Sequence, residues 1–368
     1  MDEVVDPHQN GAPCAPVLQV TVSNQRRGAE VFAVDLAAEL IRRGLDAPAV
    51  ALAATEERNA LPVRALGGTP LGVSTLRALR REVAAVGAVV AHGSRTLPAC
   101  AAATAGTGVP FVYRSIGDPR AWSSRGMRRW RTTALLRRPR LVAALWQGAA
   151  DALVAQHGVP VDRIRVIPNG VPVERCPVVG DVARQEARDL LDLPADAPVV
   201  AYVGSLSADK DVGAAVAAVA DLPGVHLLVV GAGPDRGELE AHAARDAPGR
   251  VHFAGTLPQV FPALAAADTV VLPSRTEGMP GVLVEAGLCG LPVVATGVGA
   301  VAEIVVDGET GMLVAPGDVA AMRGSLRAAL ADDGAMGLAA RAHCLERFEI
   351  RTVGAAWAEL LRELAGPR

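Results

Sequence analysis

Short apolar segments alternate with longer amphipathic ones along most of the 368-residue chain. In the amphipathic segments the apolar residues recur at helical spacing, as Phe32, Leu36 and Leu40 do. This alternation predicts parallel sheets with helices on both faces, because parallel strands need crossover connections. We expect strands at 17–22, 49–53, 88–91, 111–113, 141–145, 163–167, 199–203, 226–230, 251–253, 269–272 and 291–295, and helices at 29–43, 75–85, 97–105, 127–136, 148–157 and 352–364.

The alternating elements fall into two units, and a chain of this length favours two domains over one. We expect a disordered N-terminus over residues 1–15, an N-terminal domain over 16–178 and a C-terminal domain over 179–349. A linker rich in Pro and Val joins them at 171–180. The predicted fold class is α/β with two doubly wound Rossmann-like domains, whose ligands bind at the carboxyl ends of the strands, in the crevice between the domains.

The composition limits which kinds of binding partner and which cellular compartment we expect for this protein. Hydrophobic residues make up 51% of the chain but aromatic residues only 3%, so small aliphatic side chains must build the core. The formal charge of -3 argues against nucleic acid as a partner, because counterion release needs a basic surface. The chain shows no signal peptide and no apolar run long enough to span a membrane, which predicts a cytoplasmic protein. The scattered cysteines, without zinc spacing, are typical of a reducing compartment.

The segment from Ser274 to Thr296, SRTEGMPGVLVEAGLCGLPVVAT, carries the most informative pattern in the chain. It places two carboxylates, Glu277 and Glu285, eight residues apart around a Met-Pro-Gly turn. A helix is expected to begin after Gly281, and a helix start offers free N–H groups and a positive dipole end to a phosphate. Carboxylates instead accept hydrogen bonds from sugar or ribose hydroxyls. Taken alone, Glu285 would fit a solvated helix face, so the interpretation depends on its neighbours.

This segment resembles the E-x7-E signature of the retaining GT-B glycosyltransferases of family 4. The resemblance covers about residues 199–319 and, more loosely, the N-terminal half. It implies two domains that face each other across a cleft, and a last helix within residues 350–368 that crosses back to complete the first domain. It also implies a nucleotide-diphosphate sugar as donor, retention at the anomeric carbon, and no metal ion or cofactor.

The resemblance assigns roles to several residues of this segment. The donor lies against the C-terminal domain, where Glu285 holds the ribose and Glu277 contacts the sugar ring near the reacting centre. The residues implied to meet the sugar hydroxyls and the phosphate are Gly278, Met279, Pro280, Gly281, Val282 and Leu283.

Lys210 is the only lysine in the chain and lies in the loop after the first strand of the second unit. The loop resembles the family's G-R-L-x-x-x-K element, which makes Gly204, Ser205 and Lys210 donor-binding candidates. A compact ammonium can stabilise the leaving diphosphate, so Lys210 joins Glu277 as a candidate catalytic residue. Because Ser205 replaces an arginine of the family, Arg275 is the candidate for the missing cation. The alternative for Lys210 is a solvated helix cap.

Three further glycine-bearing segments follow strands. Residues 251–256 resemble the segment whose backbone meets the nucleobase, which adds Thr256 to the donor-binding candidates. Gly28 resembles the glycine of the family's first loop, which reaches the donor phosphate from the opposite domain. The turn with Gly231 and Gly233 either lets a nucleotide approach closely or simply closes a tight turn.

The chain departs from the family near the end of the fourth expected strand. Many relatives place a histidine there beside the transferred sugar, whereas this chain has Arg114 and Ser115. Arg114, Asp118 and His92 are therefore candidates for the cleft, with a satisfied structural role as the alternative for His92. The D-x-D sequence at 209–211 lies at a helix start, and we do not interpret it as a metal site.

An arginine-rich segment at 125–140 is interleaved with tryptophans. One interpretation is an interfacial patch, which would contact either anionic lipid or an acidic acceptor. The other is a solvated helix in an arginine-biased protein, and we favour the solvated helix. The residues concerned are Arg125, Arg128, Arg129, Arg131, Arg137, Arg138 and Arg140, with Trp122, Trp130 and Trp146.

These features together predict a transferase that moves a hexosyl group from a nucleotide-diphosphate sugar to a small-molecule, lipid-linked or glycan acceptor. It would be cytoplasmic or peripheral at the inner membrane face. Two alternatives stay open: a catalytically weak sugar-nucleotide-binding partner of another transferase, suggested by the missing histidine and by Ser205, and a sugar-nucleotide epimerase on the same fold. The sequence does not name the sugar, the base or the acceptor.

Overall fold

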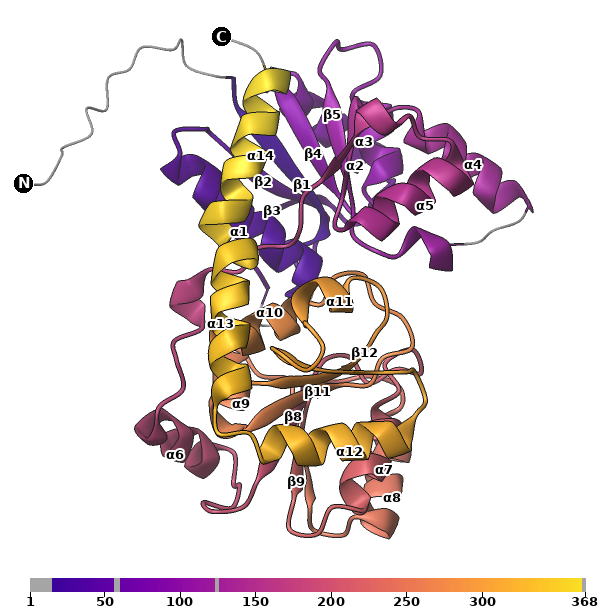
Figure 1. Cartoon of the computed structure of the whole chain (residues 1–368). Helices are drawn as coiled ribbons and strands as arrows, with labels where there is room; N and C mark the ends of the chain where they lie inside the picture. The colour runs from indigo at the N-terminus through magenta and orange to yellow at the C-terminus, as the bar shows by residue number, and fades with distance from the viewer. Residues whose placement is uncertain (1–14, 56–59, 123–125, 366–368) are drawn as a thin grey trace, which may run out of the picture.

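The computed structural model describes residues 15–55, 60–122 and 126–365, which form two lobes, each on one parallel sheet (Figure 1). The first sheet has seven strands in the order β3-β2-β1-β4-β5-β6-β7. Its strands are β1 (Val17–Ser23), β2 (Ala49–Ala53), β3 (Arg64–Gly67), β4 (Ala88–His92), β5 (Phe111–Ser115), β6 (Leu141–Ala144) and β7 (Ile164–Val166). Of the N-terminal residues expected to be disordered, 1–14 lie outside the described residues.

The second sheet has six strands in the order β10-β9-β8-β11-β12-β13. Its strands are β8 (Val199–Val203), β9 (His226–Val230), β10 (Val251–Gly255), β11 (Thr269–Leu272), β12 (Val293–Thr296) and β13 (Gly311–Val314). The sequence did not reveal β3 and β13. Both are four residues long, contain a glycine and lie at a sheet edge, so their apolar pattern is weak. The two-domain α/β fold is confirmed.

Helices connect most successive strands, as is usual for parallel pairing; between β2 and β3 no helix is described. The first lobe contains α1 (Gly28–Arg42), α2 (Val73–Val83), α3 (Leu97–Ala103), α4 (Gly126–Leu136) and α5 (Gln147–His157), with the 3-10 turns η1 (Pro119–Ala121), η2 (Val161–Arg163) and η3 (Val173–Arg175). The second contains α6 (Asp181–Leu190), α7 (Val212–Ala220), α8 (Arg236–Asp246), α9 (Phe261–Ala266), α10 (Gly281–Leu288), α11 (Val301–Ile304), α12 (Val319–Leu330) and α13 (Ala335–Phe348). Among the described residues, no helix combines the length and apolarity needed to cross a lipid bilayer.

The central strands are buried on both faces, because helices cover both sides of each sheet. In the first sheet Val89, Val90 and Ala91 have no exposed surface, and in the second sheet Val199 and Val200 have none. Near-continuous burial of small aliphatic residues is typical of parallel sheets and accounts for the low aromatic content. Each fully buried Val side chain stabilises the fold by roughly 1.5–3 kcal/mol.

The chain crosses between the lobes twice, and the two crossings meet. The Val171 N–H donates to Phe348 O at 2.9 Å, and the Ile350 N–H donates to Val171 O at 3.0 Å. Beyond this junction α14 (Ile350–Ala365) packs on α1, with Trp357 fully buried, while α13 packs on α10 (Figure 1). The predicted helix that crosses back to the first domain is therefore confirmed. The residue limits of the two domains stay a prediction.

Candidate functional site

Two loops at the carboxyl ends of β8 and β11 bring together a lysine, a glutamate and a serine. Lys210 Nζ donates to Glu277 Oε1 at 2.8 Å, and Ser274 Oγ donates to the same oxygen at 2.6 Å. These residues meet because β8 and β11 are neighbours in the sheet. Glu277 is 9% exposed, and 21% of the Lys210 side chain is exposed. An ammonium carries three N–H donors, so Lys210 can bind an anion while it keeps Glu277.

The last residue of β12 and residues that follow it hold the loop that carries Glu277. Thr296 Oγ1 donates to Ser274 O at 2.5 Å, and the Ala300 N–H donates to Gly278 O at 2.8 Å. Gly299 has a φ of +58°, and a Cβ there would lie 2.1 Å from Glu277 O, so the close approach needs glycine. These contacts fix the carboxylate before any ligand arrives, which is the preorganisation that an electrostatic site requires.

Arg275 does not supply a free cation to this cluster. Its Nε donates to Asp211 Oδ2 at 3.0 Å, and its backbone N–H donates to Asp209 O at 2.8 Å. The Arg275 side chain is 66% exposed. The expectation that Arg275 replaces the family arginine at Ser205 therefore loses support, because its guanidinium is engaged by Asp211.

Helix α10 begins beside this cluster, at the predicted residue. Pro280 is its N-cap, and no atom lies within 4 Å of the position that a Cβ on Gly281 would take. Val282 is partly exposed, whereas Leu283 is fully buried and belongs to the core. Within this first turn the Leu283 N–H donates to Pro280 O at 3.2 Å. The Gly281 and Val282 N–H groups precede the first intrahelical hydrogen bond, so the helix start can receive an anion.

Glu285 lies one turn into α10 and is half-buried. Burial raises the pKa of Glu285 to about 7, while the positive charge of Arg175 lowers it and the negative charge of Asp35 raises it. Arg175 Nη2 and Asp35 Oδ2 form an ion pair at 2.8 Å. Glu285 is thus not on a solvated helix face, and it lies where the linker and α1 approach the second domain.

The glycines after β9 close a tight turn. A Cβ on Gly231, whose φ is +140°, would lie 1.8 Å from Gly204 O, and a Cβ on Gly233 would lie 2.0 Å from Leu206 O. The β8 and β9 loops are also joined by a hydrogen bond of 3.0 Å from the Leu206 N–H to Ala232 O. Of the two readings of this turn, the structure supports close packing.

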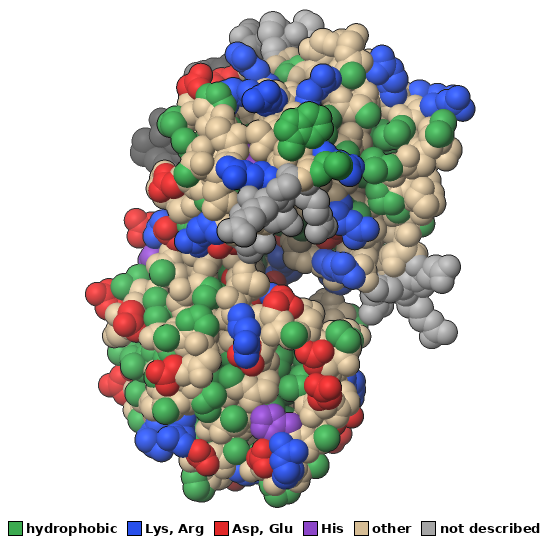
Figure 2. Space-filling model, turned by 90° about the vertical axis from the view of Figure 1, so that its right-hand side faces the viewer, with side chains coloured by type: hydrophobic (Ala, Val, Ile, Leu, Met, Phe, Trp, Pro, Cys, Tyr) green, Lys and Arg blue, Asp and Glu red, His purple; other side chains and the backbone are tan. Residues whose placement is uncertain are grey.

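Three predicted donor-binding residues lie at exposed positions near strand ends. Ser205 and Thr256 follow β8 and β10, and Gly28 begins α1 with nothing within 4 Å of an added Cβ. Their contacts with a donor stay a prediction. The space-filling view shows a hollow between the two lobes (Figure 2).

His92 and Arg114 are candidates for the cleft, with a satisfied structural role as the alternative for His92, and the structure buries both side chains. They are 2% and 1% exposed, because Phe32 and Asn169 cover them. The two side chains contact each other, with 3.3 Å between Arg114 Nη1 and His92 Nδ1. Burial and the charge of Arg114 hold the pKa of His92 well below its usual range, and burial lowers the pKa of Arg114 to about 9.

Asp118 has a local role. Its Oδ1 accepts from the Arg120 backbone N–H at 2.9 Å and caps η1, and the two side chains form an ion pair at 2.9 Å. The carboxylate is therefore engaged by its own turn.

The arginine-rich segment divides into exposed and buried parts. Trp146 is 4% exposed and belongs to the core, and Trp122 packs against His157 with 5.6 Å between the ring centroids and the rings tilted by 51°. Met127 and Trp130 lie three residues apart on α4, and they are 76% and 71% exposed. Trp146 is therefore not part of an exposed patch, and Arg125 lies outside the described residues.

Two residues of the site were not singled out by the sequence. Ser274 stands in the quoted P-S-R-T-E run, and its place directly after β11 was the available signal. Asn169 stands in a Pro-Asn-Gly run that indicates only a turn. Its amide contacts residues 55 and 110 positions away, which no local pattern encodes.

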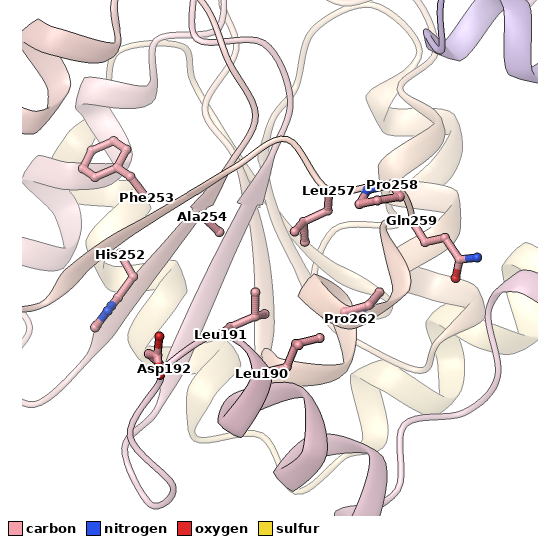
Figure 3. A pocket seen from close by; sticks show the side chains of 10 residues that line it. All are labelled: Leu190, Leu191, Asp192, His252, Phe253, Ala254, Leu257, Pro258, Gln259 and Pro262. Carbon is pink, nitrogen blue, oxygen red and sulfur yellow. The ribbon is translucent and has the colours of Figure 1, made fainter. Parts of the chain in front are cut away.

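A separate cavity of about 710 Å³ lies between β10, α9 and the end of α6 (Figure 3). Most of its lining is apolar, and it includes none of Lys210, Glu277 and Glu285. Its walls are Leu190, Leu191, Asp192, His252, Phe253, Ala254, Leu257, Pro258, Gln259 and Pro262. The cavity is therefore distinct from the lysine–glutamate cluster.

Two facing Rossmann-like domains with such a cluster at the strand ends define the GT-B class. The family models described as Glycosyltransferase Family 4 and Glycosyl transferases group 1 match residues 26–175 and 197–332. Together they cover more than three quarters of the chain. The chain belongs to family 4 of the GT-B glycosyltransferases.

Curated relatives and solved structures agree with this assignment. The chain is 36% identical over 209 residues to a D-inositol 3-phosphate glycosyltransferase of Xylanimonas cellulosilytica, covering 53% of this chain and 49% of the relative. It is 34% identical over 206 residues to a 2-deoxystreptamine glucosyltransferase of Streptomyces kanamyceticus, covering 54% and 53%. The chain thus spans about half the length of these relatives. The structure of HepE from Anabaena in complex with UDP-glucose superposes with a TM-score of 0.84 at 26% identity, over 95% of this chain and 100% of that one.

Proposed function

We propose that this protein transfers a hexosyl group from a nucleotide-diphosphate sugar to an acceptor, with retention at the anomeric carbon and without a metal ion. The observation that carries the proposal is the Lys210–Glu277–Ser274 cluster beside the start of α10. It places one ammonium, one carboxylate and a helix N-terminus at the carboxyl ends of neighbouring strands. In doubly wound folds, that edge is where ligands bind.

The cationic part of the site suits the leaving group. The donor's pyrophosphate would lie at the start of α10, where Gly281 leaves open space, and Lys210 would contact it. When the bond between the anomeric carbon and the phosphate oxygen breaks, the nucleoside diphosphate leaves with the electron pair. The ammonium is already fixed by Glu277, so it can stabilise this charge without reorganisation.

The acidic part of the site suits hydroxyl groups. Both hydrogen bonds to Glu277 reach Oε1, so Oε2 can accept a sugar hydroxyl. Glu285 would accept from the ribose once its carboxyl is ionised. Because the HepE structure contains UDP-glucose, a UDP-sugar is the first donor to test.

The acceptor would enter from the first domain. The names of the two curated relatives mention an inositol phosphate and an aminocyclitol, which makes small polyols the first acceptors to test. The exposed Met127 and Trp130 on an arginine-rich helix support a peripheral contact with an anionic lipid surface as a second feature of the proposal.

Two other functions stay open on this site. The burial of Arg114 leaves the position of the family histidine without an exposed polar side chain, which favours a weakly catalytic sugar-nucleotide-binding partner. An epimerase would use the same donor pocket without an acceptor.

A single assay separates the three. The purified protein is incubated with UDP-glucose, with and without a panel of polyol acceptors, in the presence of EDTA, and the products are followed by proton NMR. Release of UDP together with an α-linked product is the expected result. Donor binding without turnover would favour the partner, and a changed sugar without acceptor would favour the epimerase. If neither UDP-glucose nor another nucleotide sugar binds, the proposal is wrong.

A further inference from the structure

One side chain joins the two domains at the edge of the candidate donor site. Asn169 follows β7, and its amide oxygen accepts a hydrogen bond from Arg114 Nη2 in the first domain. Its Nδ2 donates to Met279 O in the second domain at 2.9 Å, and its backbone N–H lies 3.1 Å from Met279 Sδ. The amide thus accepts from one domain and donates to the other.

The first-domain end of this connection is anchored in the sheet. Arg114, on β5, lies over the Phe32 ring with 3.8 Å to the centroid, and its Nη1 donates to His92 Nδ1. His92 Nε2 in turn donates to Gln19 Oε1 at 2.9 Å. Gln19 and His92 are 0% and 2% exposed. Three adjacent strands therefore hold the guanidinium in one place, with solvent excluded.

The second-domain end is the turn that starts α10. Met279 is 6% exposed and stands between Gly278 and the N-cap Pro280. A Cβ on Gly278 would lie 2.1 Å from Ile116 O, so this turn also packs against the loop after β5. Two residues upstream, Glu277 holds Lys210. The position of Met279 therefore sets where the helix start and the Glu277 carboxylate stand relative to the first domain.

The same stretch of chain lies at the point where the lobes are joined. Gly170 follows Asn169, and a Cβ on it would lie 3.0 Å from side-chain atoms of Ile350 and Val353. Val171 then hydrogen-bonds to both sides of the α13–α14 junction. Asn169 therefore lies where a change in the angle between the lobes would directly move the turn that starts α10.

We propose that Asn169, held by Arg114, is a positioning residue that fixes the Met279–Gly281 turn and so couples the arrangement of the two domains to the donor phosphate site. This inference rests on the proposed function of that site. The asparagine does not touch the reacting atoms. It acts through Met279 on the helix start and on the Lys210–Glu277 pair.

The inference separates two kinds of substitution. Asn169→Asp keeps an acceptor for Arg114 but loses the donor to Met279 O and places a carboxylate oxygen beside that carbonyl. Asn169→Ala loses both contacts. Thr269→Val is the matched control, because it removes another buried hydrogen bond, of 3.0 Å from Thr269 Oγ1 to Pro292 O. Thr269 begins β11, whereas the site lies beyond the opposite end of that strand.

The experiment measures donor kinetics with UDP-glucose, UDP affinity by calorimetry and Tm for the wild type and these variants. Asn169→Asp is expected to lower kcat/KM by about 10- to 100-fold, because a small misplacement of a positioned group has effects of that size. Thr269→Val is expected to lower Tm but to change kcat/KM by less than twofold. A kcat/KM for Asn169→Asp within twofold of wild type, or a loss no larger than that of Thr269→Val, overturns the inference.

Hydrogen exchange supplies a readout that does not depend on turnover. In full-length Asn169→Ala, amides of residues 278–283 should exchange at least several-fold faster than in wild type, while amides of α7 should not change. Equal exchange at 278–283 overturns the inference. If Asn169→Asp does not fold, Met279→Leu replaces it in the test, because this substitution removes only the sulfur contact. Met279→Leu should raise the KM for UDP-glucose measurably. An unchanged KM counts against the inference. Failure of the proposed function is distinct, because the wild type would then bind no nucleotide sugar.

Discussion

Residues 16–178 contain 22 arginines and 11 acidic residues, whereas residues 179–349 contain 11 basic and 23 acidic residues. The formal charges of the two domains are therefore +11 and -12, although both are built on parallel sheets with the same kind of connections. In Figure 2 Lys and Arg side chains predominate on the upper lobe, and acidic side chains are more frequent on the lower one. One fold type thus presents opposite charge on the two sides of a cleft.

The opposite charges of the two domains imply that a phosphate would experience different electrostatic conditions in each domain. The acidic domain as a whole repels phosphate, so the proposed donor binding there depends on local groups: Lys210 and the start of α10. In the basic domain the overall field attracts anions. The net charge of -3 combines the +11 and -12 of the two domains with -2 from residues 1–15 and 350–368, so the argument from net charge against nucleic acid applies to the second domain and not to the first.

The largest effect should follow loss of the only lysine. Lys210→Ala is expected to raise the transfer barrier by about 2–4 kcal/mol, which lowers kcat roughly 30- to 1,000-fold. Arg245→Ala is the control, because it removes a positive charge from the same domain at a side chain that is 68% exposed. Steady-state kinetics with UDP-glucose measure both. Equal losses in the two variants would mean that domain charge, and not a local ammonium, acts on the donor.

The next effect concerns the ribose. Glu285→Gln should weaken UDP binding by about 1.5–3 kcal/mol, or roughly 10- to 150-fold, because a charge-assisted hydrogen bond is lost. Isothermal titration calorimetry of UDP against both proteins measures this. An unchanged affinity would remove Glu285 from the donor site.

The pH dependence of the same binding gives a second test. The pKa of Glu285 is raised to about 7, so in the free protein much of the carboxyl is protonated below neutral pH. Binding that needs the carboxylate must release this proton, so UDP affinity should rise from pH 6 to pH 8 and level off above the pKa. The rise should be absent in Glu285→Gln. The same pH profile in both proteins would show that another group titrates.

A smaller effect is expected from the exposed face of α4 in the basic domain. The double variant Met127→Ser and Trp130→Ser should bind vesicles of anionic phosphatidylglycerol several-fold more weakly than wild type, because apolar insertion adds to electrostatic attraction. Leu338→Ser is the matched control, since Leu338 is 74% exposed but lies on the acidic domain. Co-sedimentation measures binding. If wild type does not bind these vesicles, the membrane contact is wrong.

The smallest effect should come from Arg275→Ala. Its ion pair with Asp211 is largely exposed, and such pairs contribute about 0.2–1 kcal/mol. We expect kcat/KM with UDP-glucose to fall by less than about fivefold. A loss as large as that of Lys210→Ala would restore Arg275 as the second cation of the site.

The sequence predicted those parts of the molecule that depend on local pattern and strand order. Lys210 and Glu277 could be expected at one site because each follows a buried strand, and the ends of parallel strands lie at the same edge. The start of α10 at Gly281 was likewise visible, because Pro280 and the apolar run after it mark a helix start.

Other parts could not be predicted, because they depend on which distant residues cover a side chain. Position at a strand end places His92 and Arg114 at the cleft edge, but Phe32 and Asn169, from other elements, bury them. The link from Asn169 to Met279 spans 110 residues and leaves no periodic signal. Similarly, β3 and β13 are held by their neighbours more than by their own short sequences.

A crystal structure of the wild-type protein with UDP-glucose tests the central claim most directly. The pyrophosphate should lie within hydrogen-bonding distance of Lys210 Nζ and of the first N–H groups of α10, with the ribose hydroxyls on Glu285. A nucleotide bound in the apolar cavity at β10 instead, or one that contacts neither Lys210 nor the start of α10, would contradict the account.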